Sequence, residues 1–177
     1  MFFFSKSKPV LKELIEDYVD IHSHLLPGID DGSKDLNMTI ELIQSLKKIG
    51  FSQFTATPHI IKNIWDNDKS QIEALLKTTS ADLMDRGITD PFRAAAEYMM
   101  DDSFSKLLKS EPLLTIKDNY ILVEMSYINP PMQLYDILFE IRVAGYQPIL
   151  AHPERYLFYH SNFDEYKKLK KAGCLLQ

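Results

Sequence analysis

The sequence predicts an α/β protein built on a parallel sheet or barrel, and two features of the chain support this prediction. A helical segment, a glycine and an apolar strand follow one another four times, at Gly50, Gly87, Gly145 and Gly173. The strand segments are apolar along almost their whole length, as in ILV and PILA, which is typical of strands buried on both faces. Strands that alternate with helices in this way favour βα units and parallel pairing.

Five strands and the start of a sixth are expected in chain order. The first is a short apolar run with polar residues at its end, YVDIHSH. The next two read FSQFTATPH and PFRAAAEYM, and the fourth and most apolar reads NYILVEMS. The fifth reads QPILAHPE, and CLLQ at the end of the chain resembles a strand that has just begun. Because the sequence stops inside this last strand, we expect the chain to be a C-terminally incomplete fragment.

Helices are expected between these strands. The one after the first strand can be capped by Ser33 or Asp35, carries an apolar stripe that includes Ile40 and Ile43, and ends at Gly50. Other helices are expected over residues 10–16, 69–84, 103–109 and 132–143, and in a last segment that ends at Gly173. The lysine-rich segment 167–171 closes this last helix, where cations suit the helix dipole.

Composition restricts the class of protein. A chain of 177 residues with 45% hydrophobic residues suits one globular domain. The net charge of −5 argues against general binding to nucleic acid or to an anionic membrane, since both require a basic face. No stretch approaches the roughly 20 apolar residues of a transmembrane helix. The single cysteine, Cys174, excludes an intramolecular disulfide and suits a packing role, so we expect a cytoplasmic protein.

Histidine and acidic side chains recur at the predicted C-terminal ends of the strands. In chain order these are His22 and His24, His59, Glu97, Glu124 and His152, with Asp30 and Asp31 in the loop after the first strand. The C-terminal ends of parallel strands converge on one face of a barrel, so we expect these side chains in one pocket. Histidine nitrogen together with carboxylate oxygen suits zinc, manganese or iron.

Each of these residues also has a simpler interpretation. A lone buried histidine is more often a hydrogen-bonded core residue, and an Asp-Asp-Gly sequence is more often a turn. However, His22 and His24 at i and i+2 point to the same face of a strand. Glu97 and Glu124 end apolar strands, where a bare buried carboxylate is costly. Because the simpler interpretations would have to hold at five strand ends at once, we favour a metal site.

Two residues near the predicted pocket have open roles. Arg155, three residues after His152, suits bidentate binding of a phosphate, although a surface ion pair with Glu154 explains it equally well. Trp65 follows His59 in a long loop, where it either borders the pocket or packs in the core.

Five motifs resemble those of the PHP (polymerase and histidinol phosphatase) superfamily. They are DIHSHLLPGIDDG, TPH, AAEYM, LVEMS and LAHPERY. HSHLLPGIDDG together with AHPERY is most similar to the bacterial tyrosine-protein phosphatase branch, which is associated with capsule and exopolysaccharide synthesis. The resemblance extends from Tyr18 to Gln177.

The resemblance implies a distorted (βα)7 barrel with three divalent ions, usually Mn²⁺, with Zn²⁺, Fe or Mg²⁺ as alternatives. The first ion would be bound by His22, His24 and Glu97. The second would be bound by Glu97, Glu124 and His152. The third would be bound by Asp31 and His59, and Arg155 would bind the substrate phosphate. Such phosphatases also carry a late Asp-x-His, which this sequence does not reach. We therefore expect residues 1–177 to form a single domain truncated before its last strand or strands.

The resemblance further implies hydrolysis of phosphotyrosine by a metal-bridging hydroxide. The substrate would be a phosphotyrosine protein, a bacterial tyrosine kinase that controls polysaccharide export. Three alternatives stay open: a histidinol-phosphate phosphatase, an amidohydrolase, and a non-catalytic regulatory domain. The amidohydrolases typically bridge their ions with a modified lysine after the fourth strand, where this chain has Glu124. The oligomeric state is also left open.

Overall fold

The strands in the part of the chain that the structure describes all pair in parallel, as the sequence predicts. The computed structural model describes residues 17–177, so the helix expected over residues 10–16 lies outside the described residues. Eight strands in this part of the chain form two sheets. Every ladder that joins neighbouring strands within these sheets is parallel.

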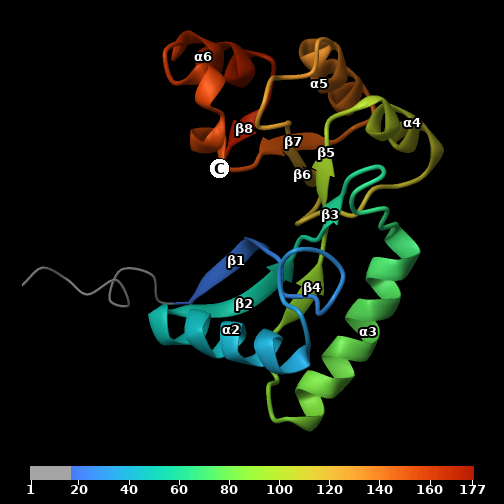
Figure 1. The fold of residues 1–177 in the computed structure, drawn as a ribbon, viewed down its shortest axis with the longest axis vertical. Helices are drawn as coiled ribbons and strands as arrows, with labels where there is room; N and C mark the ends of the chain where they lie inside the picture. Colours follow the sequence, from blue (N-terminus) through green and yellow to red (C-terminus); the bar gives the residue numbers. More distant parts are fainter. Residues whose placement is uncertain (1–16) are drawn as a thin grey trace, which may run out of the picture.

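The first sheet has three strands in the order β1-β2-β4. These strands are β1 (Tyr18–Ser23), β2 (Phe51–Ala56) and β4 (Phe92–Ala94). The helices that connect them are α2 (Leu36–Ile49) and α3 (Lys69–Asp85). Both helices lie beside this sheet in the lower half of Figure 1.

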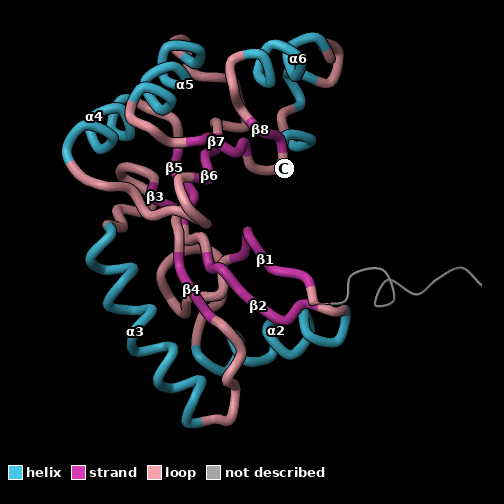
Figure 2. Tube along the Cα trace, turned by 180° about the vertical axis from the view of Figure 1, so that it is seen from behind, coloured by secondary structure: helices cyan, strands magenta, loops and turns pink. Residues whose placement is uncertain are grey.

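The second sheet has five strands in the order β3-β5-β6-β7-β8. These strands are β3 (His59–Ile60), β5 (Glu97–Met99), β6 (Tyr120–Glu124), β7 (Gln147–Leu150) and β8 (Leu175–Leu176). The helices are α4 (Asp102–Ser110), α5 (Leu134–Val143) and α6 (Asp164–Lys171). Figure 2 shows these three helices around the second sheet, with the two sheets end to end.

The second and third predicted strands are each divided into two pieces. The sequence FSQFTATPH forms β2 and then β3, with the break at Thr57 and Pro58, and PFRAAAEYM forms β4 and then β5. Proline has no N–H to donate to a ladder, which explains the first break. When the pieces are taken together, strand order follows chain order across both sheets. His59 and Glu97 therefore open new strands, and they are direct neighbours in the β3–β5 ladder.

The helix ends follow the predicted signals. Asp35 caps α2 by accepting a hydrogen bond from the Met38 N–H, and Gly50 ends the helix with a φ of 115°. Lys168, Lys170 and Lys171 lie in the last turn of α6. Local capping chemistry thus places the helices where the sequence indicates.

The core runs between the sheets and their helices. Cys174 is 1% exposed and belongs to this core, and burial raises the pKa of its thiol to about 12. The predicted packing role of Cys174 is therefore confirmed. Within residues 17–177 no ladder joins β1 to β8, so the described strands form open sheets rather than a closed barrel. None of the described helices is both long and apolar enough to cross a membrane.

Candidate metal centre

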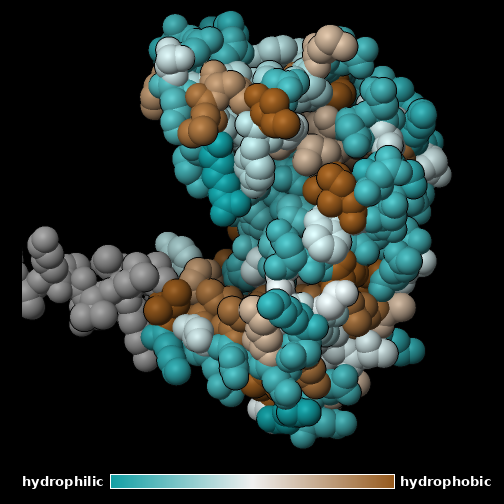
Figure 3. Space-filling view, in the orientation of Figure 1, coloured by the Kyte–Doolittle hydropathy of each residue, from teal (hydrophilic) through white to brown (hydrophobic). Residues whose placement is uncertain are grey.

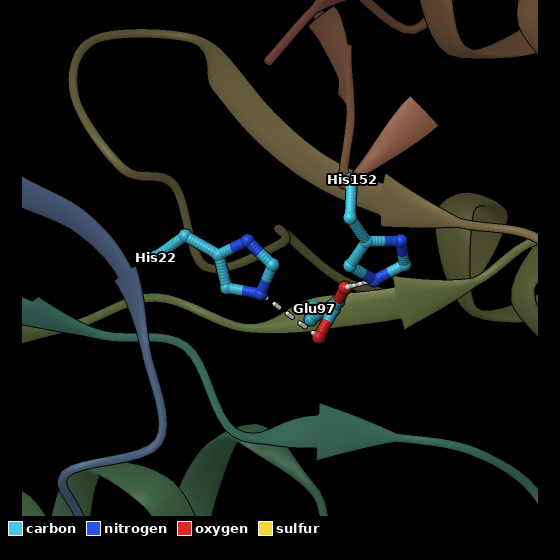
Figure 4. Close-up of side chains that lie close together, drawn as sticks. All are labelled: His22, Glu97 and His152. Carbon is cyan, nitrogen blue, oxygen red and sulfur yellow. Dashed lines mark hydrogen bonds and ion pairs between the residues drawn. The ribbon is translucent and has the colours of Figure 1, made fainter. Parts of the chain in front are cut away.

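Four histidines surround the carboxylate of Glu97, which is fully buried. Glu97 Oε2 lies 3.2 Å from His22 Nε2, 3.3 Å from His24 Nε2 and 3.3 Å from His59 Nδ1. Glu97 Oε1 lies 2.9 Å from His152 Nε2. Figure 4 shows His22 and His152 approaching the two oxygens of this carboxylate from opposite sides. Glu97 therefore connects residues from β1, β3 and the segment after β7.

A second buried carboxylate, Glu124 at the end of β6, extends the cluster. Glu124 Oε1 lies 2.8 Å from His59 Nδ1, and Glu124 Oε2 lies 3.8 Å from His152 Nε2. Glu124 is 2% exposed. The two glutamates thus share two histidines, and every member of the cluster is contributed by a strand or by the segment directly after one.

The two adjacent aspartates of the Asp-Asp-Gly sequence have different surroundings. The Asp30 side chain is buried, and its Oδ2 accepts from His24 Nδ1 at 2.6 Å and from the His59 N–H at 3.0 Å. The Asp31 side chain is 65% exposed, and its Oδ1 lies 3.6 Å from His59 Nε2. Asp31 therefore lies at the edge of the cluster, whereas Asp30, to which the sequence assigned no role, lies buried behind His24.

Asp30 orients the imidazole ring of His24. By accepting the proton of His24 Nδ1, it turns the other ring nitrogen of His24 towards Glu97. Asp30 Oδ1 also accepts the Gly32 N–H at 3.0 Å, which closes the loop. A Cβ at Gly32 would lie 2.2 Å from His24 Cβ, so only glycine fits beside the histidine.

The nitrogen and oxygen atoms of the cluster are better arranged to bind divalent cations than to form hydrogen bonds with one another. His59 Nδ1, Glu97 Oε2 and Glu124 Oε1 are buried and have no hydrogen-bond partner of acceptable geometry, although they lie within 3.3 Å of neighbouring donor atoms. Two atoms that bind one ion at about 2.1 Å lie roughly 3 to 3.4 Å apart. Three sets of side chains each offer ligand atoms that lie within 4.8 Å of one another: His22, Glu97 and His152; His24, His59 and Glu97; and His24, Asp30 and Asp31.

The charges of the cluster shift its pKa values in opposite directions. Burial raises the pKa of Glu97, but the hydrogen bond from His152 and the close pairing with His22 and His24 outweigh it and hold that pKa well below its ordinary value. Burial lowers the pKa of His24, but the hydrogen bond to Asp30 and the close pairing with Glu97 outweigh it and raise that pKa to about 10. The pKa of His22 and of His59 is also raised, because pairing with Glu97 and Glu124 respectively exceeds the effect of burial. In the metal-free protein, protonated histidines therefore offset the negative charge of the carboxylates.

We expect the thermal stability of the metal-free protein to fall as the pH rises from 6.5 to about 10. The pKa of His24 in the folded chain lies above its ordinary value of 6.5, so its contribution is complete below pH 6.5 and is lost on the way to about pH 10. With Mn²⁺ the trend should reverse, because metal binding requires neutral histidines. Melting curves from pH 6 to 9, recorded in chelator and in Mn²⁺, test this. Parallel curves would contradict it.

Asp30→Asn is expected to weaken Mn²⁺ binding by about 10- to 100-fold, since a carboxylate behind a ligating histidine fixes its orientation and basicity. Isothermal titration of the metal-free protein with Mn²⁺ measures the effect. Asp66→Asn is the control, because Asp66 pairs with Lys62 outside the cluster. Equal affinities in the two variants would show that Asp30 does not support the site.

All predicted site residues line one open pocket of about 1600 Å³. These residues are His22, His24, Asp31, His59, Glu97, Glu124, His152 and Arg155. The space-filling view is hollowed between β1 and the C-terminal end of the chain (Figure 3). His152 adopts the left-handed conformation with a φ of 33°, a strained geometry of the kind found at functional sites.

Arg155 and Trp65 lie at the edge of this pocket. Arg155 Nη1 donates to Tyr127 Oη at 3.1 Å, and among the described residues it makes no ion pair with Glu154. Trp65 is half-buried and lines the pocket. Of its two predicted roles, the structure therefore supports the one at the border of the pocket. Tyr127 and Gln177 were not predicted. Gln177 Oε1, the side-chain amide oxygen, lies 2.8 Å from His22 Nδ1, which brings the residue after β8 to the site.

A parallel α/β fold with a buried histidine–carboxylate cluster beside its strand ends defines a class of candidate metal-binding proteins. The chain belongs to the capsular polysaccharide synthesis family CpsB/CapC, whose family model matches residues 18–177. The resemblance seen in the motifs is therefore confirmed.

Relatives of known name agree with this assignment. The chain is 28% identical over 160 residues to the putative tyrosine-protein phosphatase CapC of Staphylococcus aureus, covering 90% of this chain and 63% of that protein. It is 28% identical over 138 residues to the tyrosine-protein phosphatase YwqE of Bacillus subtilis, covering 77% of this chain and 54% of that protein.

A solved structure has the same fold. It comes from work describing YwqE from Bacillus subtilis and CpsB from Streptococcus pneumoniae as metal-dependent tyrosine phosphatases. The TM-score is 0.83 at 25% identity, and the match covers 90% of this chain and 65% of that one. The chain thus spans less than two thirds of the length of CapC and YwqE.

Proposed function

We propose that this chain carries the catalytic site of a metal-dependent protein-tyrosine phosphatase. The observation that carries the proposal is the convergence of four histidines on the buried Glu97 carboxylate, in the same pocket as Arg155. The names of CapC and YwqE support the reaction, and the metal dependence stated for the solved relatives supports the cofactor.

In this proposal the ligands act as the motifs imply. His22, His24 and Glu97 bind the first of three divalent ions, with Mn²⁺ as the cofactor. Glu97, Glu124 and His152 bind the second. Asp31 and His59 bind the third. When bound, such ions lower the pKa of a water molecule and polarise the phosphoryl oxygens.

The remaining groups bind and orient the substrate. The Arg155 guanidinium pairs with two phosphate oxygens and stabilises the charge that develops on them. Its hydrogen bond to Tyr127 holds the arginine at the side of the pocket in the free protein. A tyrosine phenolate, with an ordinary pKa of about 10, leaves more readily than an alkoxide, so protonation of the leaving group matters less for this substrate class.

We further propose a cytoplasmic location and a bacterial tyrosine kinase of capsule synthesis as the substrate protein. The family match to capsular polysaccharide synthesis supports this choice. We also propose that residues 1–177 form a single PHP-type domain and that its sheets belong to a distorted (βα)7 barrel. The support is a strand order that follows the chain across both sheets.

The test compares a phosphotyrosine peptide with histidinol phosphate as substrates of the Mn²⁺-loaded protein. We expect release of phosphate from the peptide and loss of that activity in chelator. Turnover of histidinol phosphate alone would overturn the proposal in favour of the histidinol phosphatases. Full metal occupancy without turnover of either substrate would favour a regulatory domain.

A further inference from the structure

Large apolar side chains stand exposed at the opening of the metal pocket. Three of them follow Glu124 in the segment between β6 and α5: Tyr127, Ile128 and Met132 are 50%, 85% and 100% exposed. The fourth is Ile64, 68% exposed, in the loop after β3. All four line the pocket that holds the histidines. We refer to Ile64, Tyr127, Ile128 and Met132 as the apolar rim.

The loops that carry the apolar rim are held in place. The Ile61 N–H donates to the Trp65 carbonyl at 3.0 Å and the Trp65 N–H donates to the Ile61 carbonyl at 2.9 Å, which presents Ile64 in a closed turn. In the other loop, the Ile128 N–H donates to Ser126 Oγ at 3.2 Å. Pro130 and Pro131 restrict the backbone between Ile128 and Met132. Little backbone conformational entropy is then lost when a ligand packs against the rim.

The apolar rim is continuous with the anion-binding side of the pocket. Tyr127 accepts the hydrogen bond from Arg155, and its ring centroid lies 5.6 Å from that of His152. One pocket therefore presents cation-binding and anion-binding groups within and exposed apolar side chains at its opening. A small polar phosphate ester would leave these side chains in water, whereas a phosphotyrosine within a polypeptide brings neighbouring residues to them.

We propose that the apolar rim docks the polypeptide that carries the phosphotyrosine, with apolar residues beside the phosphotyrosine packing on Ile128 and Met132. This inference rests on the proposed function and adds a preference for sequence. Exposed apolar side chains that surround a pocket commonly mark a binding surface. The flexible methionine suits neighbours of different shape, so the preference is for apolar character rather than for one residue type.

The test uses two fluorescein-labelled peptides in which a difluoromethylphosphonate replaces the tyrosine phosphate ester, so that neither is hydrolysed. One has leucine on both sides of the phosphonotyrosine and the other has serine. Fluorescence anisotropy with the Mn²⁺-loaded protein should give about tenfold tighter binding of the leucine peptide. In I128S/M132S this preference should fall to less than about twofold, because the apolar contact surface is gone.

The control is F139S/V143S. Phe139 and Val143 are 69% and 71% exposed on α5 and lie outside the pocket lining. This variant, like I128S/M132S, therefore replaces two exposed apolar side chains with serine. The control should keep the preference for leucine. Because Ile128 and Met132 are 85% and 100% exposed and contribute almost nothing to the core, I128S/M132S should fold normally, which circular dichroism checks.

Each outcome decides one question. The inference is overturned if the parent protein binds both peptides equally or not at all, if I128S/M132S keeps the preference, or if F139S/V143S loses it. Dissociation of a dimer in I128S/M132S without a change in peptide preference would assign the rim to a second copy of the chain and would also overturn it. Peptide preference without hydrolysis of phenyl phosphate or of phosphotyrosine peptides would leave the docking surface standing and would refute the phosphatase.

Discussion

Replacing Glu97 by glutamine is expected to weaken Mn²⁺ uptake by more than about 100-fold and to abolish any metal-dependent activity. Glu97 is the one carboxylate that all four clustered histidines contact, with both of its oxygens engaged. The amide keeps the shape of the side chain but removes the charge and one acceptor oxygen. Metal content after dialysis against Mn²⁺, measured by atomic emission, gives the result directly.

The control for this substitution is Glu73→Gln, since Glu73 is exposed on α3 and contacts none of the histidines. Circular dichroism of Glu97→Gln should establish that the variant folds. An undiminished metal content in a folded Glu97→Gln protein would contradict the proposal that Glu97 is a metal ligand. Loss of metal from the Glu73→Gln control would show that the measurement is not specific to the cluster.

Arg155→Ala is expected to lower kcat/KM for a phosphotyrosine peptide by about 10²- to 10³-fold while metal content stays unchanged. The guanidinium lies at the edge of the metal pocket and its neighbour is the Tyr127 hydroxyl, so its removal leaves no buried charge behind. Arg155→Lys should recover only part of the loss, because an ammonium group cannot form the bidentate contact with phosphate. Steady-state kinetics together with metal analysis separates the two effects.

Arg86→Ala serves as the control, because Arg86 bonds Asn37 on the exposed surface. It should retain full activity. If Arg155→Ala loses metal as well as activity, Arg155 supports the cluster rather than the substrate. If activity is retained, the phosphate must be bound by other groups of the pocket.

Much of the fold follows from local chemistry. The apolar strands and the glycines after the helices predict the alternation of elements, and the Asp35 cap and Gly50 terminus of α2 lie where the sequence indicates. The sequence pattern did not predict that the second and third strands are each divided in two. Pro58 signals the first break, but the break at Ala95 and Ala96 lies between residues that suit a continuous strand. The closure of a barrel depends on strand pairs that local patterns do not specify.

The histidines and carboxylates at the predicted strand ends were sufficient to identify the candidate metal ligands, because parallel strands bring their C-terminal ends together. The side chains that position the candidates were harder to find. Tyr127 and Gln177 lie in segments without a distinctive pattern, and their contacts with Arg155 and His22 join residues 28 and 155 positions apart.

The sequence by itself determined the alternation of strands and helices, the family and the set of metal-binding candidates, since these depend on periodicity and residue type. Only the tertiary structure decided which of those candidates lie buried within the cluster and which lie at its edge. Asp30 and Asp31 are chemically identical neighbours, yet the Asp30 side chain is 0% exposed behind His24, whereas that of Asp31 is 65% exposed. The difference arises because packing of the loop against β1 and β3 turns one carboxylate inward, and no property of either residue alone specifies which one.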